Sequence, residues 1–277
     1  MNQAKDWPNR QFWLGQTIWM LGTAILMLWA FRQWPIDEWV IAPFAGEHAP
    51  FFVHRDDWAL THLAHDGIKK IVILIGLMLA IPLIGSRWRQ QWQVWRWPAG
   101  FVLLGMLLGP SVVGILKATS AHSCPWHLAE YGGTGGYAYP LFAIPDGADA
   151  GQGKCFPGGH AAGGFGLMVF YFVARLANIR WAWRYALAGW VLGMGMGIGQ
   201  MMRGAHFLSH NLWSGWVVWL VLLIVFAVMQ RLATWRGQSM AAPAGMLSGG
   251  VVDALLTHEP QDFDQLADDA TLSMHQR

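Results

Sequence analysis

Six long apolar stretches, separated by polar connections, follow one another along the chain. Four of them contain no Asp, Glu, Lys or Arg, and each is close to the length of roughly 20 residues that a helix needs to cross a bilayer. The stretches cover residues 12–31, 67–85, 98–116, 160–177, 185–202 and 211–230. The pattern predicts an all-α, polytopic membrane protein with six transmembrane helices.

The composition supports a bilayer as the main solvent. Only 12% of the residues are charged and 55% are hydrophobic, whereas soluble domains contain about 25% charged residues. The net charge of +2 is too small to indicate a nucleic-acid partner. The stretch 12–31 is followed by no small-x-small cleavage pattern, so we expect a retained helix rather than a signal peptide.

Two short connections contain arginine and no acidic residue, and they set the expected orientation. One holds Arg87, Arg89 and Arg96, and the other holds Arg175, Arg180 and Arg184. Basic loops generally stay in the cytoplasm, so segments 32–66 and 117–159 are expected outside and both termini inside. We expect residues 1–237 to form the membrane domain and residues 238–277 a flexible cytoplasmic tail.

The chain has two cysteines, Cys124 and Cys155, and both fall in the external segment 117–159. External compartments are oxidising, which favours a disulfide between them. The alternative is two free thiols that share a loop.

Three polar segments reach the same external layer: residues 117–126, 157–160 and 199–210. Lys117 and Arg203 bring positive charge. The glycines before His160 let the backbone approach an anion at a helix start. If the third segment is helical, Arg203, His206 and His210 share one face. One imidazole could then attack phosphorus while another protonates the leaving oxygen.

A single histidine at a helix end is more often an interfacial side chain than a catalyst, and a single Lys or Arg there usually anchors topology. The arrival of three such segments in one layer favours a site. Close helix packing is also predicted, because small residues let helices approach inside membranes. The glycines concerned are Gly159, Gly163 and Gly164 in one helix and Gly193, Gly195, Gly197 and Gly199 in the other.

The order Lys-x6-x-Pro, Pro-x-Gly-His and Gly-x-His-x-x-Ser, over residues 98–225, resembles the signature motifs of the type 2 phosphatidic acid phosphatase (PAP2) superfamily, KxxxxxxRP, PSGH and SRxxxxxHxxxD. The resemblance implies a PAP2-type helical core, with His160 as general acid and His206 as the nucleophile that forms a phosphohistidine. Pro125 would close the first motif, and Gly159 would donate its amide to phosphate. The phosphate-binding residues would be Lys117, Gly158, Gly159, Gln200 and Arg203, with His210 as a third catalytic residue.

The sequence departs from the family pattern at several positions. Cys124 replaces the first-motif arginine, Gly158 the second-motif serine, Gly199 and Gln200 the Ser-Arg pair, and His210 the aspartate. Arg203 could substitute for one arginine, and a neutral His210 could accept a hydrogen bond from His206. These departures indicate a divergent subfamily with altered phosphate recognition or a weakened enzyme.

The resulting hypothesis is a lipid phosphatase of the bacterial inner membrane that hydrolyses a lipid phosphomonoester or diphosphate at the external, periplasmic leaflet without a cofactor or metal. A phosphotransferase acting on lipid A or polyprenyl diphosphate would use the same residues. A zinc enzyme built on His206 and His210, completed by His122, His127 or a free cysteine, is disfavoured because Lys117 and Arg203 would repel the cation. A non-enzymatic membrane protein with a decayed site is the remaining alternative.

Overall fold

The computed structural model describes residues 8–61, 67–137, 152–238 and 240. The chain divides into two units, Met1–Ala242 and Pro243–Arg277, and all the described residues belong to the first. The predicted tail therefore lies outside the described residues, apart from Gln238 and Met240. Within the described part the protein is all-α, with eight α-helices and one isolated bridge between Leu128 and Gly135.

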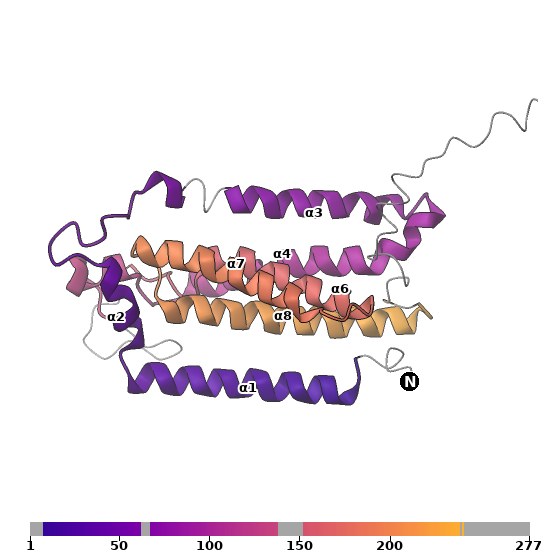
Figure 1. The fold of residues 1–277 in the computed structure, drawn as a ribbon, viewed down its shortest axis with the longest axis horizontal. Coiled ribbons are helices and arrows are strands. Elements are labelled where there is room, and N and C mark those ends of the chain that lie inside the picture. The colour runs from indigo at the N-terminus through magenta and orange to yellow at the C-terminus, as the bar shows by residue number, and fades with distance from the viewer. Residues whose placement is uncertain (1–7, 62–66, 138–151, 239, 241–277) are drawn as a thin grey trace, which may run out of the picture. The chain divides into compact units, whose positions relative to one another are not determined.

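Figure 1 shows the order of the helices. They are α1 (Arg10–Gln33), α2 (Ile36–Ile41), α3 (Ile68–Gly85), α4 (Arg96–Thr119), α5 (Gly159–Phe165), α6 (Phe170–Leu176), α7 (Trp183–Met202) and α8 (Leu208–Trp235). A 3₁₀ turn, Gly166–Val169, joins α5 to α6. All six predicted segments are helical. The segment predicted at 160–177 consists of α5, the 3₁₀ turn and α6 rather than one continuous helix. The short helix α2 was not predicted.

Among the residues that the structure describes, three helical segments are long and apolar enough to cross a membrane: Arg10–Gln33, Trp92–Thr119 and Leu208–Trp235. A multi-pass membrane protein follows from these three, whereas the six-span topology stays a prediction. The shorter helix Lys70–Gly85 is also apolar. Large apolar side chains are exposed along α1 and α3, including Ile18, Trp19, Ile25, Leu74, Leu77 and Ile81. Such a continuous apolar surface is stable in lipid and unstable in water.

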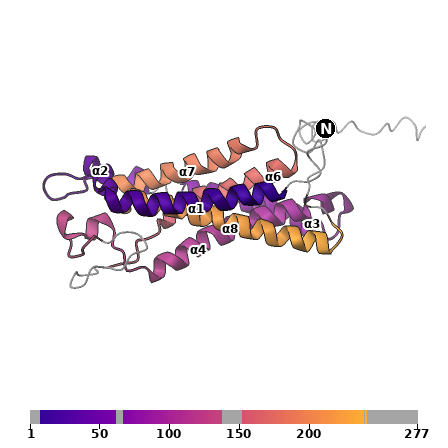
Figure 2. The same cartoon turned by 90° about the horizontal axis from the view of Figure 1, so that it is seen from below.

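The buried core lies between α4, α5, α6, α7 and α8. Its centre is aromatic: Phe172 and Phe226 have ring centroids 4.9 Å apart, and Phe101 lies 5.5 Å from Phe226. Helix α1 runs along α8, as Figure 2 shows, and is tied to it by Trp216 Nε1, which donates to the Met20 carbonyl at 3.0 Å. The core therefore fixes the helices that carry the polar segments.

Helix α7 packs tightly against α5 and against the 3₁₀ turn that follows it. A Cβ atom at Gly164 would lie 2.6 Å from the backbone nitrogen of Gly193, and a Cβ at Gly189 would lie 2.5 Å from the backbone nitrogen of Met168. Only glycine permits such an approach. The predicted glycine contact is therefore confirmed at Gly164 and Gly193.

The other glycines differ from that prediction. A Cβ at Gly163 or Gly195 would meet nothing within 4 Å. Gly197 faces Asn211 of α8, and Gly199 faces Leu60. The close contact thus depends on a short segment rather than on a continuous glycine face, because α5 is only seven residues long.

Replacing Gly164 with Ala should lower the thermal stability of the protein in detergent, by about 1–3 kcal/mol, because the methyl group forces α5 away from α7. Gly195→Ala is the matched control and should leave the melting temperature close to wild type. Equal melting temperatures for the two variants would contradict the contact.

Candidate active site

The three polar segments meet at the end of the helices where α2 lies, on the left in Figure 1. Lys117 is in the last turn of α4, His160 is the second residue of α5, and His206 is in the connection from α7 to α8. Two backbone hydrogen bonds join the segments. Gly158 N donates to the His210 carbonyl at 2.9 Å, and Trp126 N donates to the Gly204 carbonyl at 3.0 Å.

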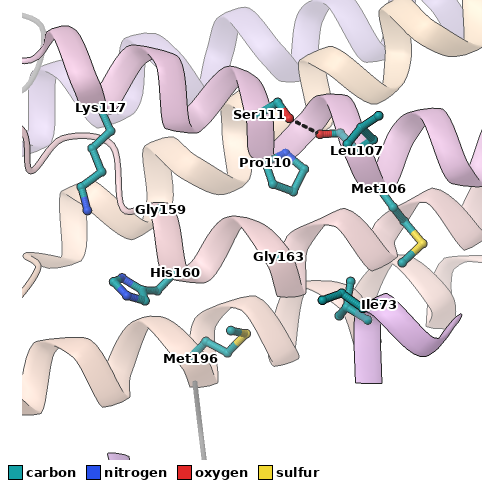
Figure 3. A pocket seen from close by; sticks show the side chains of 11 residues that line it. Ile73, Met106, Leu107, Pro110, Ser111, Lys117, Gly159, His160, Gly163 and Met196 are labelled. Carbon is teal, nitrogen blue, oxygen red and sulfur yellow. Dashed lines mark hydrogen bonds between the residues drawn. The ribbon is translucent and has the colours of Figure 1, made fainter. Parts of the chain in front are cut away.

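Lys117 lies beside the start of α5. A Cβ at Gly159 would be 3.5 Å from Lys117 Cδ and 3.9 Å from Nζ, so the lysine side chain lies within van der Waals contact distance of the start of α5. In Figure 3 the Lys117 ammonium and the His160 imidazole approach the same space from α4 and α5. Two basic side chains thus converge on one space.

Three histidines form a continuous cluster. The ring centroids of His160 and His206 are 5.7 Å apart, and those of His206 and His210 are 5.8 Å apart. His206 and His210 are each 1% exposed, whereas His160 is partly exposed. The structure thus brings the three predicted catalytic residues together, with His160 nearest to solvent.

The surroundings keep His206 neutral. Burial lowers the pKa of its imidazole well below the ordinary value of 6.5, and His210, Lys117 and His160 lower it further. A hydrogen bond with the Cys155 backbone acts in the opposite direction. A neutral imidazole carries a lone pair, which a nucleophile requires.

Cys124 and Cys155 form a disulfide, as predicted, with their Cα atoms 5.3 Å apart. Cys155 N also donates to the His122 carbonyl at 3.0 Å. The bridge therefore ties the loop after α4 to the segment that leads into α5. It lies inside the site, because Cys155 Sγ is 3.4 Å from His206 Nδ1.

Arg203 and Gln200 pair with one another. Arg203 Nη1 donates to Gln200 Oε1 at 3.3 Å, and its Nε donates to the Arg55 carbonyl at 2.8 Å. Arg203 thus lies against the segment 32–61. Neither Arg203 nor Gln200 is among the groups that shift the pKa of His206, so their phosphate-binding roles stay predictions.

Gly158 has no room for the serine of the family motif. A Cβ there would lie 2.6 Å from Asn211 Oδ1, and a Cβ at Gly197 would lie 2.7 Å from Asn211 Cγ. Asn211 is fully buried, and neither polar atom of its amide has a hydrogen-bond partner among the described residues. The sequence did not single out Asn211, since an amide in an apolar helix has no local signal.

Asp37 was also missed. It is 2% exposed, and its carboxylate accepts hydrogen bonds from Ser209 N at 2.8 Å, from Ser209 Oγ and from Tyr137 Oη at 2.8 Å. Burial raises the pKa of Asp37 to about 6, and the hydrogen bonds oppose the rise. The carboxylate holds the first turn of α8, which also contains His210. Asp37 resembles any acidic loop residue in sequence, and its partner is 172 positions away.

In the zinc-enzyme hypothesis, a free cysteine could be a ligand, and the disulfide removes Cys155 from that role. The donor atoms of Cys155, His206 and His210 all lie within 4.8 Å of one another. A metal-binding cysteine must be a thiolate, and the sulfur of Cys155 is bonded to Cys124. Two imidazoles remain, next to the positive charge of Lys117.

Comparison with known proteins identifies one family. The model of the PAP2 superfamily matches residues 98–233, which include all three polar segments. No curated protein and no solved structure matches the chain.

Asp37 should make stability depend on pH. Because its folded pKa of about 6 lies above the ordinary 3.8, the folded state binds this proton more tightly, and the contribution of Asp37 to the free energy of unfolding falls as pH rises from about 4 to 6. Asp37→Asn should remove this slope from melting temperatures measured across that range.

Glu38→Gln is the matched control, since Glu38 is the exposed acidic neighbour. It should keep most of the slope, because the burial of Asp37 is unchanged. A wild-type slope in Asp37→Asn would disprove the assignment.

Proposed function

Since residues 98–233 are a PAP2 superfamily domain, we propose that the protein removes the phosphate of a membrane lipid through a phosphohistidine formed on His206. The observation that carries this proposal is an apolar cavity that ends at Lys117 and His160. A ligand there would have its phosphate at the basic end and its hydrocarbon part among apolar side chains.

The cavity has a volume of about 530 Å³ and lies between α3, α4, α5 and α7 (Figure 3). Its lining is Val72, Ile73, Met106, Leu107, Pro110, Ser111, Lys117, Gly159, His160, Gly163 and Met196. Cavities of this size hold molecules with several apolar carbons, and a few polar groups fix their orientation. This lining supports a lipid rather than a small polar phosphate ester.

The chemistry assigns one role to each basic group. The neutral His206 attacks phosphorus, and His160, in its protonated form, gives its proton to the lipid oxygen as the phosphorus–oxygen bond breaks. Lys117 stabilises the charge on the transferring phosphoryl group. The now neutral His160 then takes a proton from water, which attacks phosphorus, releases inorganic phosphate and restores His206.

The basic connections support a site on the external leaflet. Lys117 ends α4 and His160 begins α5, whereas Arg87 and Arg89 precede α4 and Arg180 follows α6, at the opposite helix ends. The guanidinium groups of Arg180 and Arg184 lie 5.1 and 4.9 Å from the Trp181 ring, an arrangement typical of an interface. By the positive-inside rule, this arrangement supports a site on the periplasmic face of a bacterial inner membrane, where a disulfide persists.

Phosphotransfer to a second lipid is the other candidate function. It uses the same residues, with a lipid hydroxyl or phosphate in place of water. The observation that favours it is the burial of His206, which is 1% exposed. Restricted access of water would prolong the life of a phosphohistidine and favour transfer to an acceptor held in the apolar cavity.

His206→Ala and His160→Ala should each lower phosphate release by several orders of magnitude, because nucleophile and acid act as one unit. Lys117→Ala should cost roughly 10²-fold. The assay uses purified protein with phosphatidate, phosphatidylglycerol phosphate, polyprenyl diphosphate and lipid A, with and without a chelator. If phosphate release were lost only when the chelator is present, the protein would be a metal enzyme instead.

His210→Asp should raise turnover, since a carboxylate stabilises the imidazolium better than a second imidazole does. His210→Ala is the companion variant. If His210→Ala were inactive while His206→Ala kept wild-type activity, the nucleophile would be His210.

Gly163→Leu should block lipid substrates selectively. Gly163 lines the cavity, and a Cβ there meets nothing within 4 Å, so the added side chain fills the cavity rather than displacing a helix. We expect kcat/KM for a long-chain lipid phosphate to fall at least tenfold while hydrolysis of a soluble aryl phosphate persists.

Gly195→Leu is the matched control, because Gly195 also has open space but is not part of the cavity lining. It should behave like wild type on both substrates. An equal loss on both substrates for Gly163→Leu would mean that the cavity does not hold the lipid.

A further inference from the structure

We propose that Cys155, held by its disulfide with Cys124, is the residue that orients the His206 imidazole for attack. This inference rests on the proposed function, in which His206 is the nucleophile. It assigns to the bridge a positioning role in the reaction, beyond the stabilisation that any disulfide provides.

The sulfur of Cys155 lies against the nucleophile and its backbone. Sγ is 3.4 Å from His206 Nδ1 and 3.0 Å from the carbonyl oxygen of Ala205, the preceding residue. Cys155 is 0% exposed, so no water competes for these contacts. Cys155 therefore contacts both the His206 imidazole and the backbone next to it.

The chemistry of a disulfide selects one tautomer of His206. A disulfide sulfur can only accept a hydrogen bond, since it carries no proton. The proton of the neutral ring must then be on Nδ1, and the lone pair is on Nε2. Nε2 is thereby left as the attacking atom. A free thiol at the same place could donate instead and permit the opposite tautomer.

His210 does not have this role in the structure. The rings of His206 and His210 pack at 64° with centroids 5.8 Å apart, and His210 Nδ1 has no hydrogen-bond partner among the described residues. His210 stands where the family motif has a carboxylate, and it provides no hydrogen-bond acceptor for His206 from α8. Cys155 Sγ, 3.4 Å from His206 Nδ1, fills that need.

The bridge also explains the first-motif departure. Cys124 stands at the motif arginine and is followed directly by Pro125. Its bond to Cys155 holds that residue beside His206. The substitutions at 124 and 210 are therefore two parts of one change, in which a covalent brace replaces a carboxylate partner.

The test compares two backgrounds, wild type and His210→Asp, with the disulfide intact and reduced. A water-soluble phosphine supplies two electrons and becomes its oxide, the sulfurs take up two protons, and thiol labelling measures completion. A chelator is present so that freed Cys155 and the two histidines bind no metal. Cys124→Ser/Cys155→Ser repeats the comparison without reductant.

Reduction of wild type should lower kcat roughly 10- to 100-fold, by analogy with the loss of a group that orients a metal-bound histidine, with little change in KM. His210→Asp should be nearly insensitive, because its carboxylate accepts the Nδ1 proton. Ser123→Ala is the matched control: it removes the Gly153 N to Ser123 Oγ hydrogen bond of 3.3 Å between the same two chain segments and should keep kcat.

If the bridge only stabilised the fold, reduction would lower kcat by the same factor in wild type and in His210→Asp. That outcome overturns the proposal. Unchanged kcat in both backgrounds overturns it too. ¹⁵N NMR of the His206 ring gives a readout that needs no turnover. The oxidised protein should show the tautomer with the proton on Nδ1, and the reduced protein a mixture. If reduction leaves the His206 tautomer unchanged, the proposal is wrong, whether or not the protein is active. Inactivity on every lipid would refute the proposed function instead.

Discussion

The contact between α5 and α7 sets the geometry on which the site depends. With no side chain at Gly164 or Gly193, the two backbones come so close that a Cβ would lie 2.6 Å from the neighbouring nitrogen. His160 is one turn before Gly164, and α7 leads directly into the loop of His206. The 5.7 Å separation of the two imidazoles therefore depends on this approach. A wider helix pair would separate His160, the proposed acid, from His206, the proposed nucleophile.

A membrane restricts where polar chemistry can be placed, and the structure places it at helix ends. Backbone groups at helix ends lack partners within the helix, and in lipid every such group needs one. One such group is Gly158 N, at the start of α5, which donates to the His210 carbonyl and so joins two of the polar segments. Asp37 satisfies the start of α8 through Ser209. The same groups that complete the helices thus hold the catalytic residues in register.

The features predicted correctly from the sequence are those set by local composition. The apolar runs in the sequence predicted the helices α1, α3, α4, α7 and α8. The disulfide followed from there being only two cysteines. The contacts of Asp37 and Asn211 could not be predicted, because each depends on side chains that packing brings together from distant segments. Arg203 and Gln200 were predicted as phosphate ligands, and their mutual pairing, with Arg55 as a third member, also arises only in the folded chain.

The central claim is that His206 becomes covalently phosphorylated during turnover. Its most direct test is rapid acid-free quenching of the purified protein with a cleavable lipid phosphate, followed by mapping of the phosphorylated peptide by mass spectrometry under neutral conditions. The account predicts an acid-labile, base-stable phosphoryl group on His206 that appears before free phosphate and is absent from His206→Ala. A phosphoryl group on His210, or release of phosphate with no covalent intermediate at any quench time, would contradict it.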